Sequence, residues 1–322
     1  MKKIQGIFLI LVCVIVLTTI MSDVFWGSYN LENVLRRTAL FGIISIGVAF
    51  VIITGGIDLS IGSVICLVGC GLPWLLVEQE VSVPVALLAV LGFSLAVGLI
   101  HGILVTKVKL QPFVVTLCGL LLYRGITRGF TGDQSQGFGT DFKGIRELAT
   151  GEIPLFGFNF PMPCLFLVVV AVLAGVFLNK TIYGRYLLAL GNNEEAAKFS
   201  GIDVDKMVIL AYVICALCSG LGGLLFVLDV NSAQPVDFGN FYELYAIAAA
   251  VLGGCSLRGG SGTILGVVIG AALMQVLRNM IVLVDWIPTH IEYAIIGAVI
   301  LAGVVADEMI KRAVAKKRAS QG

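Results

Sequence analysis

One carboxylate stands between two apolar runs that are each long enough to cross a membrane. Asp58 lies in the stretch VIITGGIDLSIGSVICLVGC, residues 51–70, after the pair Gly55–Gly56 and before the second apolar run. An ionisable side chain within a membrane span costs about 2.5–3.5 kcal/mol on insertion scales, so it needs compensation from its surroundings. Asp58 is therefore the first residue whose chemistry has to be explained.

Two interpretations of Asp58 are consistent with the sequence. Glycine lets a helix end, and a carboxylate just before a new helix can accept hydrogen bonds from the free backbone N–H groups of Ser60 or Ile61. Alternatively, the break lines a polar path, because non-helical backbone at membrane depth is tolerated only where protein or a water-filled cavity covers it. One side chain can serve both purposes, and the sequence leaves both open.

Other ionisable side chains are scarce at membrane depth. Apart from Asp58 they are Arg124, Glu243, Arg278 and His101. Pumps and ion-coupled carriers usually keep relays of carboxylate or histidine side chains inside the membrane. This thin set therefore favours a source of energy other than an ion gradient, and an ion-coupled secondary carrier is the less favoured alternative.

Sequence motifs of catalysis are missing. The sequence has no GxxxxGK[ST] phosphate loop, no HExxH and no GxSxG, and its only histidines are His101 and His290. The eight cysteines lie mostly in apolar runs, and the pairs at helical spacing have no nearby His or third Cys to complete a metal site. The sequence therefore predicts a chain with no catalytic residue, cofactor or metal. Any ATP that drives it is expected to be hydrolysed on a partner chain.

The composition is that of a membrane protein. Of the 322 residues, 58% are hydrophobic and 13% are charged, whereas ordinary globular domains are about 25% charged. The net charge of +1 gives no basic surface for a nucleic-acid partner. A span needs about 20 apolar residues, and windows of that length predict an all-α, polytopic helical bundle with broken or re-entrant segments. About ten spans are expected, at residues 5–22, 37–54, 59–77, 83–105, 113–130, 162–179, 207–228, 241–256, 263–283 and 291–308.

Lysine and arginine set the expected orientation of a single membrane domain over residues 1–322. With the N-terminus inside, most of the 21 basic residues fall on cytoplasmic loops and on the tail KRAVAKKR at 311–318. Both termini are therefore expected in the cytoplasm. The basic tail can also bind anionic membrane lipid, although a role in topology is the favoured interpretation. Two loops are long, one outside at about 131–161 and one inside at about 180–206.

A weak internal repeat joins two of the expected breaks. GGIDLSIGS at 55–63 and GGCSLRGGS at 253–261 share five of nine residues. Transporters often carry repeats whose interrupted helices meet at the substrate path. The shared glycine and serine content explains the match almost as well, so the repeat is a hypothesis.

The inner loop contains a predicted helix outside the membrane. In GNNEEAAKFSGIDVDK, Gly191 and Asn192–Asn193 precede EEAAKFS, which favours a helix of about two turns, and Gly201 ends it. On pattern alone, this short amphipathic helix is best interpreted as a solvated connector.

Four motifs in matching order give the chain a family resemblance. ITGGIDLSIGS, LQPFVVTLCGLLLYRG, GRYLLALGNNEEAAKFSGI and ELYAIAAAVLGGCSLRGGSGT closely resemble segments of the sugar-type permeases of bacterial ABC importers, the ribose permease family, over about residues 37–305. In that family, two permeases, identical or paralogous, work with two ATPase units and a periplasmic sugar-binding protein. The resemblance implies a multi-pass protein of the bacterial inner membrane that carries a monosaccharide such as ribose, xylose or galactose. Relatives also move branched-chain amino acids or signalling furanosides, so these solutes remain alternatives.

The resemblance also implies two sets of site residues. A coupling segment that docks in a cleft of the ATPase is implied at Gly191, Asn192, Asn193, Glu194, Ala196, Ala197, Ser200 and Gly201. A translocation path is implied at Gly55, Gly56, Asp58, Ser60, Thr116, Arg124 and Glu243. Hydrogen-bonding groups suit this path because a sugar presents hydroxyl groups and no charge.

Overall fold

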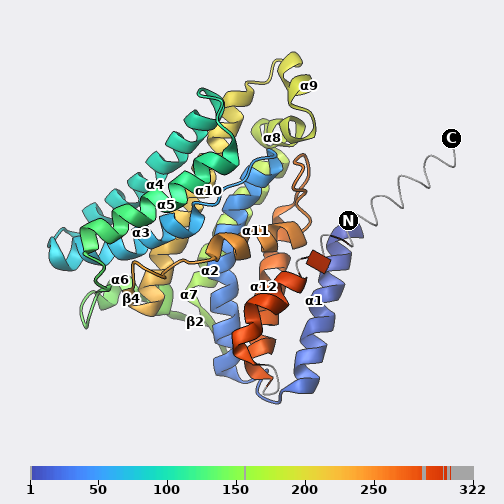
Figure 1. The fold of residues 1–322 in the computed structure, drawn as a ribbon. Helices are drawn as coiled ribbons and strands as arrows, with labels where there is room; N and C mark the ends of the chain where they lie inside the picture. Colours follow the sequence, from blue (N-terminus) through green and yellow to red (C-terminus); the bar gives the residue numbers. More distant parts are fainter. Residues whose placement is uncertain (1, 156, 285–287, 300, 303–304, 306–322) are drawn as a thin grey trace.

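The described part of the chain is built almost entirely of helices (Figure 1). The structure is a computed structural model that describes residues 2–155, 157–284, 288–299, 301–302 and 305. The longer helices are α1 (Lys2–Met21), α2 (Ser28–Ile53), α3 (Ile61–Pro73), α4 (Val83–Thr106), α5 (Pro112–Thr131), α7 (Met162–Lys180), α10 (Val204–Val230) and α12 (Ile264–Leu283). The shorter ones are η1 (Trp74–Glu78), α6 (Lys143–Thr150), α8 (Ile182–Asn192), α9 (Glu194–Phe199), α11 (Tyr242–Leu252) and η2 (Thr289–Ile291).

Eight of the described helical segments are long and apolar enough to cross a membrane. They confirm the prediction of an all-α polytopic bundle, and α3 reaches this length only together with η1. The segment expected to span at 241–256 contains α11, a helix of 11 residues. At about 1.5 Å per residue such a helix crosses only about half of the hydrocarbon layer, so α11 is a half-span. The expected span at 291–308 and the basic tail at 311–318 lie partly or wholly outside the described residues.

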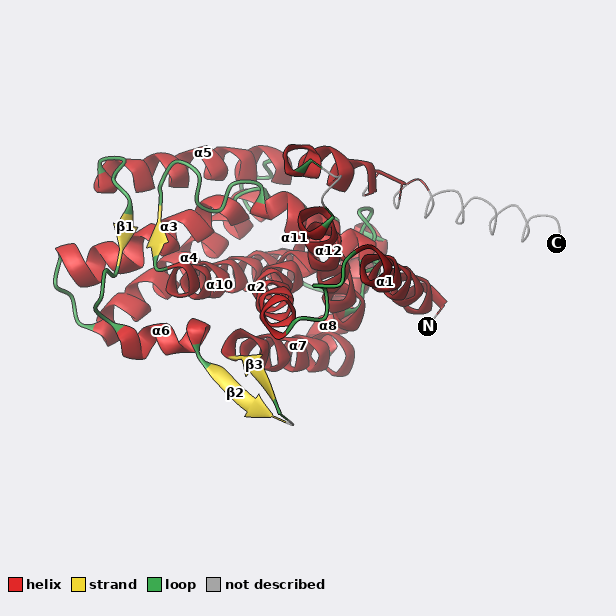
Figure 2. Ribbon diagram, turned by 90° about the horizontal axis from the view of Figure 1, so that it is seen from below, coloured by secondary structure: helices red, strands yellow, loops and turns green. Residues whose placement is uncertain are grey.

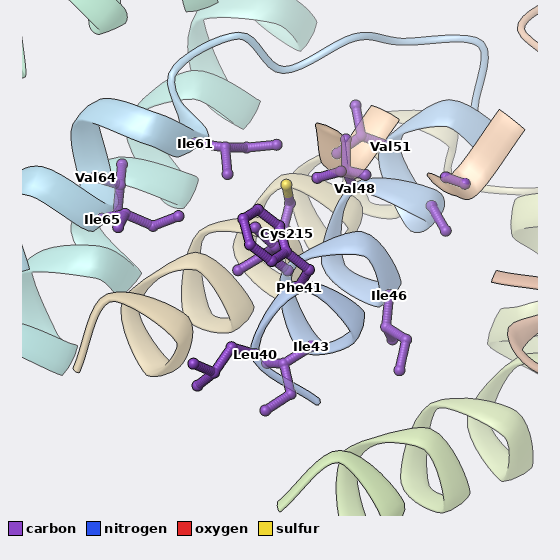
Figure 3. Close-up of a cluster of buried hydrophobic side chains, with 14 of the residues drawn as sticks. Leu40, Phe41, Ile43, Ile46, Val48, Val51, Ile61, Val64, Ile65 and Cys215 are labelled. Carbon is purple, nitrogen blue, oxygen red and sulfur yellow. The ribbon is translucent and has the colours of Figure 1, made fainter. Parts of the chain in front are cut away.

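Helix α2 forms the centre of the bundle because its part from Ala39 onward is apolar all round. It packs against α10, α12, α7 and α11, and every residue from Ala39 to Ile53 is buried. Figure 3 shows side chains of α2 such as Phe41 and Val48 packed with Ile61 and Ile65 of α3 and with Cys215 of α10. In Figure 2, α2 and α10 lie between α5 on one flank and α7 on the other.

Glycines bring α4 and α10 into backbone contact. A Cβ atom on Gly98 would lie 2.7 Å from the Cα of Val213 and 2.8 Å from the carbonyl oxygen of Tyr212. One turn further along α4, a Cβ atom on Gly102 would lie 2.7 Å from the Cα of Ile209. Small residues at such crossings let helices approach closely where water does not drive their association.

Alanine at Gly98 is therefore expected to lower the stability of the chain by about 1–3 kcal/mol, the usual cost of overpacking. Gly92 lies on the same helix with no described atom within 4 Å of its Cβ position, so Gly92→Ala is the matched control. That control should be neutral or stabilising, by up to about 1 kcal/mol, because alanine favours the helix. Thermal unfolding of both variants in detergent measures the difference. Equal melting temperatures would contradict the close crossing.

The long loop at about 131–161, expected on the outside, is partly folded. It contains α6 and a hairpin of β2 (Glu152–Leu155) and β3 (Phe158–Pro161). Upstream of these, β1 (Gln136–Gly137) pairs with β4 (Ser232–Ala233), which begins the loop between α10 and α11. The two loops are therefore joined at one end of the bundle, and α8 and α9 lie at the other end (Figure 1).

Candidate functional site

The chain leaves its helical conformation directly after α2. Gly55 has a φ of +82°, a conformation that glycine adopts without strain. Residues 54–60 are then non-helical until α3 begins at Ile61. Tyr212 of α10 holds this segment by donating a hydrogen bond of 3.0 Å from its hydroxyl to the carbonyl of Ile57. The predicted break in the membrane domain is therefore present; Asp58 and Ser60 in it are buried, whereas Gly55 is exposed.

Asp58 accepts hydrogen bonds at the start of α3. Its Oδ1 accepts from the backbone N–H of Ser60 at 2.9 Å and from the Ser60 hydroxyl at 2.7 Å. Asp58 is 2% exposed and Ser60 is 1% exposed. This confirms the capping interpretation for Ser60. The path interpretation depends on what else surrounds the carboxylate.

Polar side chains from other helices interact electrostatically with Asp58, among them His101 of α4, Tyr123 of α5 and Tyr212 of α10. The Tyr123 hydroxyl lies 2.9 Å from Nε2 of His101. Nδ1 of His101 is buried and has no hydrogen-bond partner among the described residues. Helices α4, α5 and α10 and the segment before α3 therefore contribute to a polar cluster inside a mostly apolar bundle.

Glu243 brings a second carboxylate to the same region. It lies in the first turn of α11 and is 8% exposed. Its carboxylate sits so close to Gly62 that any Cβ there would overlap with it and with the carbonyl oxygen of Gly239. The first turns of the half-span α11 and of α3 therefore meet inside the bundle. Helix N-termini carry positive partial charge, which favours the carboxylates of Asp58 and Glu243 at this position.

Arg124 of α5 ties the loop before α11 to the bundle. Its Nη1 donates hydrogen bonds to the carbonyl of Pro235 at 3.1 Å and to that of Phe238 at 3.0 Å. Arg124 also interacts electrostatically with Glu243. The guanidinium group of Arg124 thus supplies hydrogen-bond donors to carbonyls of a loop outside the helices.

The sequence-predicted path residues are only partly brought together. Asp58, Ser60, Arg124 and Glu243 share the region where α3 and α11 begin, and Gly55 and Gly56 form the break that leads to it. Thr116 is buried, but its hydroxyl donates to the carbonyl of Pro112, 2.9 Å away in its own helix. Sequence reasoning noted His101 as an ionisable side chain at membrane depth but did not assign it to the path, and it missed Tyr212. Among the described residues, no group of three or more His, Cys, Asp or Glu side chains is placed to hold a metal ion.

The predicted inner helix is present as α9. Asn193 is its N-cap, with Oδ1 accepting from the backbone N–H of Ala196 at 2.9 Å. A salt bridge between Glu194 and Lys198 spans one turn and raises the pKa of the lysine. The helix ends before Gly201, which has a φ of +80°. The capping residue and the terminating glycine are those that the sequence indicates.

The predicted coupling residues differ in exposure. Asn192, Asn193, Glu194, Ala196, Ser200 and Gly201 are exposed, Gly191 is half-buried, and Ala197 is buried at 4% exposure. The largest apolar side chain on α9 is Phe199, which is 92% exposed. Sequence reasoning did not single out Phe199. The sequence did carry a signal for this exposed side chain. Phe199 is an aromatic residue in a short charged helix, and the only apolar residues that share the helix with it are alanines.

The connection from α9 to α10 is held by charge. Oδ1 of Asp203 caps α10 by accepting from the backbone N–H of Lys206 at 3.1 Å. The side-chain hydrogen bond from Lys206 lowers the pKa of Asp203 below its usual value. Because the pKa is depressed, the cap is charged at neutral pH and is lost only in acid. Lys107, beyond the end of α4, forms a salt bridge of 2.7 Å with Asp205 in the first turn of α10. This salt bridge connects the turn after α4 to the start of α10.

Comparison with known proteins gives matches along nearly the whole chain. Residues 30–304 match the family model described as branched-chain amino acid transport system / permease component. The ribose import permease protein of Escherichia coli K12 is 36% identical over 310 residues, which cover 94% of this chain and 93% of the relative. The ribose import permease protein of Bacillus subtilis is also 36% identical, over 94% and 92% of the two chains. A xylose transport system permease protein of Haemophilus influenzae is 31% identical, over 95% and 97%. No solved structure matches the chain significantly.

Proposed function

The chain belongs to the family described as branched-chain amino acid transport system / permease component, and from this we propose that it is the membrane subunit of an ATP-driven importer of a monosaccharide. The observation that carries the choice of solute is the similarity to ribose and xylose permeases over 94–95% of the chain. The family description itself names amino acids, so a branched-chain amino acid or a furanoside is the alternative cargo. Fold similarity alone does not decide between these solutes.

We propose that the polar cluster where α3 and α11 begin lies on the translocation path. Asp58, Ser60 and Glu243 offer hydrogen-bonding groups without a mid-membrane ion relay, which suits an uncharged polyol. Asp58 and Ser60 are almost fully buried, so a solute reaches them only when the surrounding helices shift. Weak binding in the path is sufficient if a separate binding protein captures the sugar outside.

We propose that α9 is the docking element for a separate ATPase subunit. Its support is an exposed aromatic residue, Phe199, beside the small exposed residues Ala196 and Ser200 on a helix outside the membrane. Aromatic side chains are the usual anchors of protein interfaces, and small neighbours let a partner approach closely. The buried Ala197 seats α9 on its own chain, so the exposed members of the segment are the ones proposed to touch the partner.

The protein is a multi-pass membrane protein, and we propose the bacterial inner membrane with α9 and the N-terminus in the cytoplasm. In Figure 1 the N-terminal end of α1 lies on the same side of the bundle as α8 and α9. A periplasmic sugar-binding protein is then expected to approach from the side that carries α6 and the β2–β3 hairpin. A second permease copy, identical or paralogous, completes the proposed assembly.

Transport by the reconstituted assembly tests this proposal. The permease is reconstituted with the ATPase subunit and the sugar-binding protein of its importer in vesicles that contain ATP. We expect ATP-dependent accumulation of one of ribose, xylose and galactose, and no accumulation of leucine. Uptake of leucine instead would favour the amino-acid alternative. Accumulation of sugar by the permease alone under an ion gradient would identify an ion-coupled carrier and refute the proposal.

A further inference from the structure

Three segments that are far apart in the sequence meet at the inner face beside α9. They are the end of α2 at Ile53, the end of α8 at Gly191 and Asn192, and the loop between α11 and α12 at Gly259 and Gly260. We call these five residues the inner junction. We propose, resting on the proposed function above, that the inner junction passes movement of α9 to both breaks of the membrane domain, with Asn192 as its positioning residue.

Hydrogen bonds connect the three segments in series. Nδ2 of Asn192 donates to the carbonyl of Gly260 at 3.0 Å and to that of Leu188 in its own helix at 2.8 Å. The backbone N–H of Gly260 donates to the carbonyl of Ile53 at 2.9 Å. Since Asn193 is the N-cap of α9, the residue that reaches the loop is next to the one that starts the proposed docking helix.

Backbone contact makes the inner junction stiff. A Cβ atom on Gly191 would overlap with the carbonyl oxygen of Ile53 and the nitrogen of Gly260. A Cβ atom on Gly259 would lie 2.8 Å from the carbonyl oxygen of Gly191 and 2.9 Å from the nitrogen of Gly55. Gly259 and Gly260 have φ values of +83° and +74°, which side-chain-bearing residues rarely adopt. At Gly191 and Gly259 backbone lies directly against backbone, so a displacement of α8 is transmitted to both neighbours.

The two neighbours are the segments that carry the polar cluster. The break after Ile53 leads through Asp58 into α3, and the loop around Gly260 follows α11, which carries Glu243 in its first turn. These are also the two members of the weak internal repeat, at 55–63 and 253–261. A single point of attachment on α8 therefore reaches both α3 and α11, whose first turns meet at the cluster.

Asn192→Ala tests the role of the positioning residue in the complete reconstituted assembly. The matched control is Asn179→Ala, because Nδ2 of Asn179 makes the same kind of bond to a carbonyl four residues back, Gly175 at 2.9 Å, on the exposed side of α7. Two quantities are measured: the amount of sugar moved per ATP hydrolysed, and the stimulation of ATP hydrolysis by the loaded binding protein. We expect both to fall about tenfold in Asn192→Ala and to be unchanged in Asn179→Ala. Both variants should retain the ATPase subunit and the melting temperature of the wild type, since one amide hydrogen bond contributes little net stability.

The outcomes separate this proposal from the proposed function. If wild-type vesicles import no sugar, the proposed function fails. If the wild type imports sugar and Asn192→Ala does so with the same yield per ATP, only the inner junction is refuted. Loss of the ATPase subunit would make Asn192 a docking residue, and a fall in melting temperature that Asn179→Ala does not share would assign it a purely structural role; either result would overturn the proposal. Asn192→Asp gives a second test, because it keeps the size of the side chain but removes the donor to Gly260, and it should reproduce the loss of coupling.

Discussion

Replacing Phe199 with aspartate is expected to lower sugar uptake by about 30-fold or more, the loss that corresponds to an interface hot spot of 2 kcal/mol. The side chain is 92% exposed in the free chain, so its ring contributes nothing to the packing of the bundle. We expect it to become buried in the ATPase subunit, where a carboxylate would be desolvated without a partner. Co-purification of the ATPase subunit and ATP-dependent uptake measure the effect.

Two further variants make this prediction specific. Phe199→Leu keeps an apolar side chain and should retain most of the binding. Tyr29 is 81% exposed at the start of α2, at the opposite end of the bundle, so Tyr29→Asp adds the same charge away from α9 and should leave co-purification unchanged. Normal co-purification and uptake in Phe199→Asp would refute the docking role of α9.

The choice of position matters because neighbouring residues of α9 face in different directions. Ala197 is 4% exposed, so a large side chain there would displace α9 from its own chain and would not report on a partner. Gly201 has a positive φ, so most substitutions there strain the backbone. Among the residues implied by the family resemblance, Ala196 is exposed and helical, and Ala196→Arg is the cleaner test of steric fit.

Local patterns in the sequence predicted much of the fold. Capping and terminating residues act on their immediate neighbours, which is why Asn193, Gly201 and Asp58 predicted the ends of helices correctly. The apolar windows predicted the long helices because the membrane requires a minimum length. Hydropathy did not reveal that α11 is a half-span, since a short helix buried in protein is as apolar as one that faces lipid.

Contacts between distant segments could not be predicted in the same way. The family resemblance implied Arg124 as a path residue, but its bonds to Pro235 and Phe238 depend on where the later loop returns. The inner junction is made by glycines and backbone atoms, which carry no signal of their partners in a single sequence. The resemblance also implied Thr116 as a path residue, and in the structure its hydroxyl is bonded within its own helix, as threonine often is in an apolar environment.

The two roles open to Asp58, a helix cap and a charged group on the path, make different predictions for alanine and asparagine. Asp58→Ala leaves the backbone N–H and the hydroxyl of Ser60 without their acceptor inside the bundle. Unsatisfied buried groups cost about 1–3 kcal/mol, so we expect a lower melting temperature and loss of uptake. Asp58→Asn keeps an oxygen that accepts both bonds and removes only the charge, so it should fold like the wild type.

Uptake by Asp58→Asn then decides whether the charge itself is used. A sugar needs hydrogen-bonding groups and carries no charge, so we expect uptake within a few-fold of the wild type. Ser60→Ala removes only the hydroxyl donor and keeps the backbone bond to Asp58, so its stability should lie between those of Asp58→Ala and the wild type. If Asp58→Asn keeps its melting temperature and its ATPase subunit but no longer transports, the carboxylate does more than cap α3. Its charge, held among His101, Tyr123 and Tyr212, would then be part of the transport step.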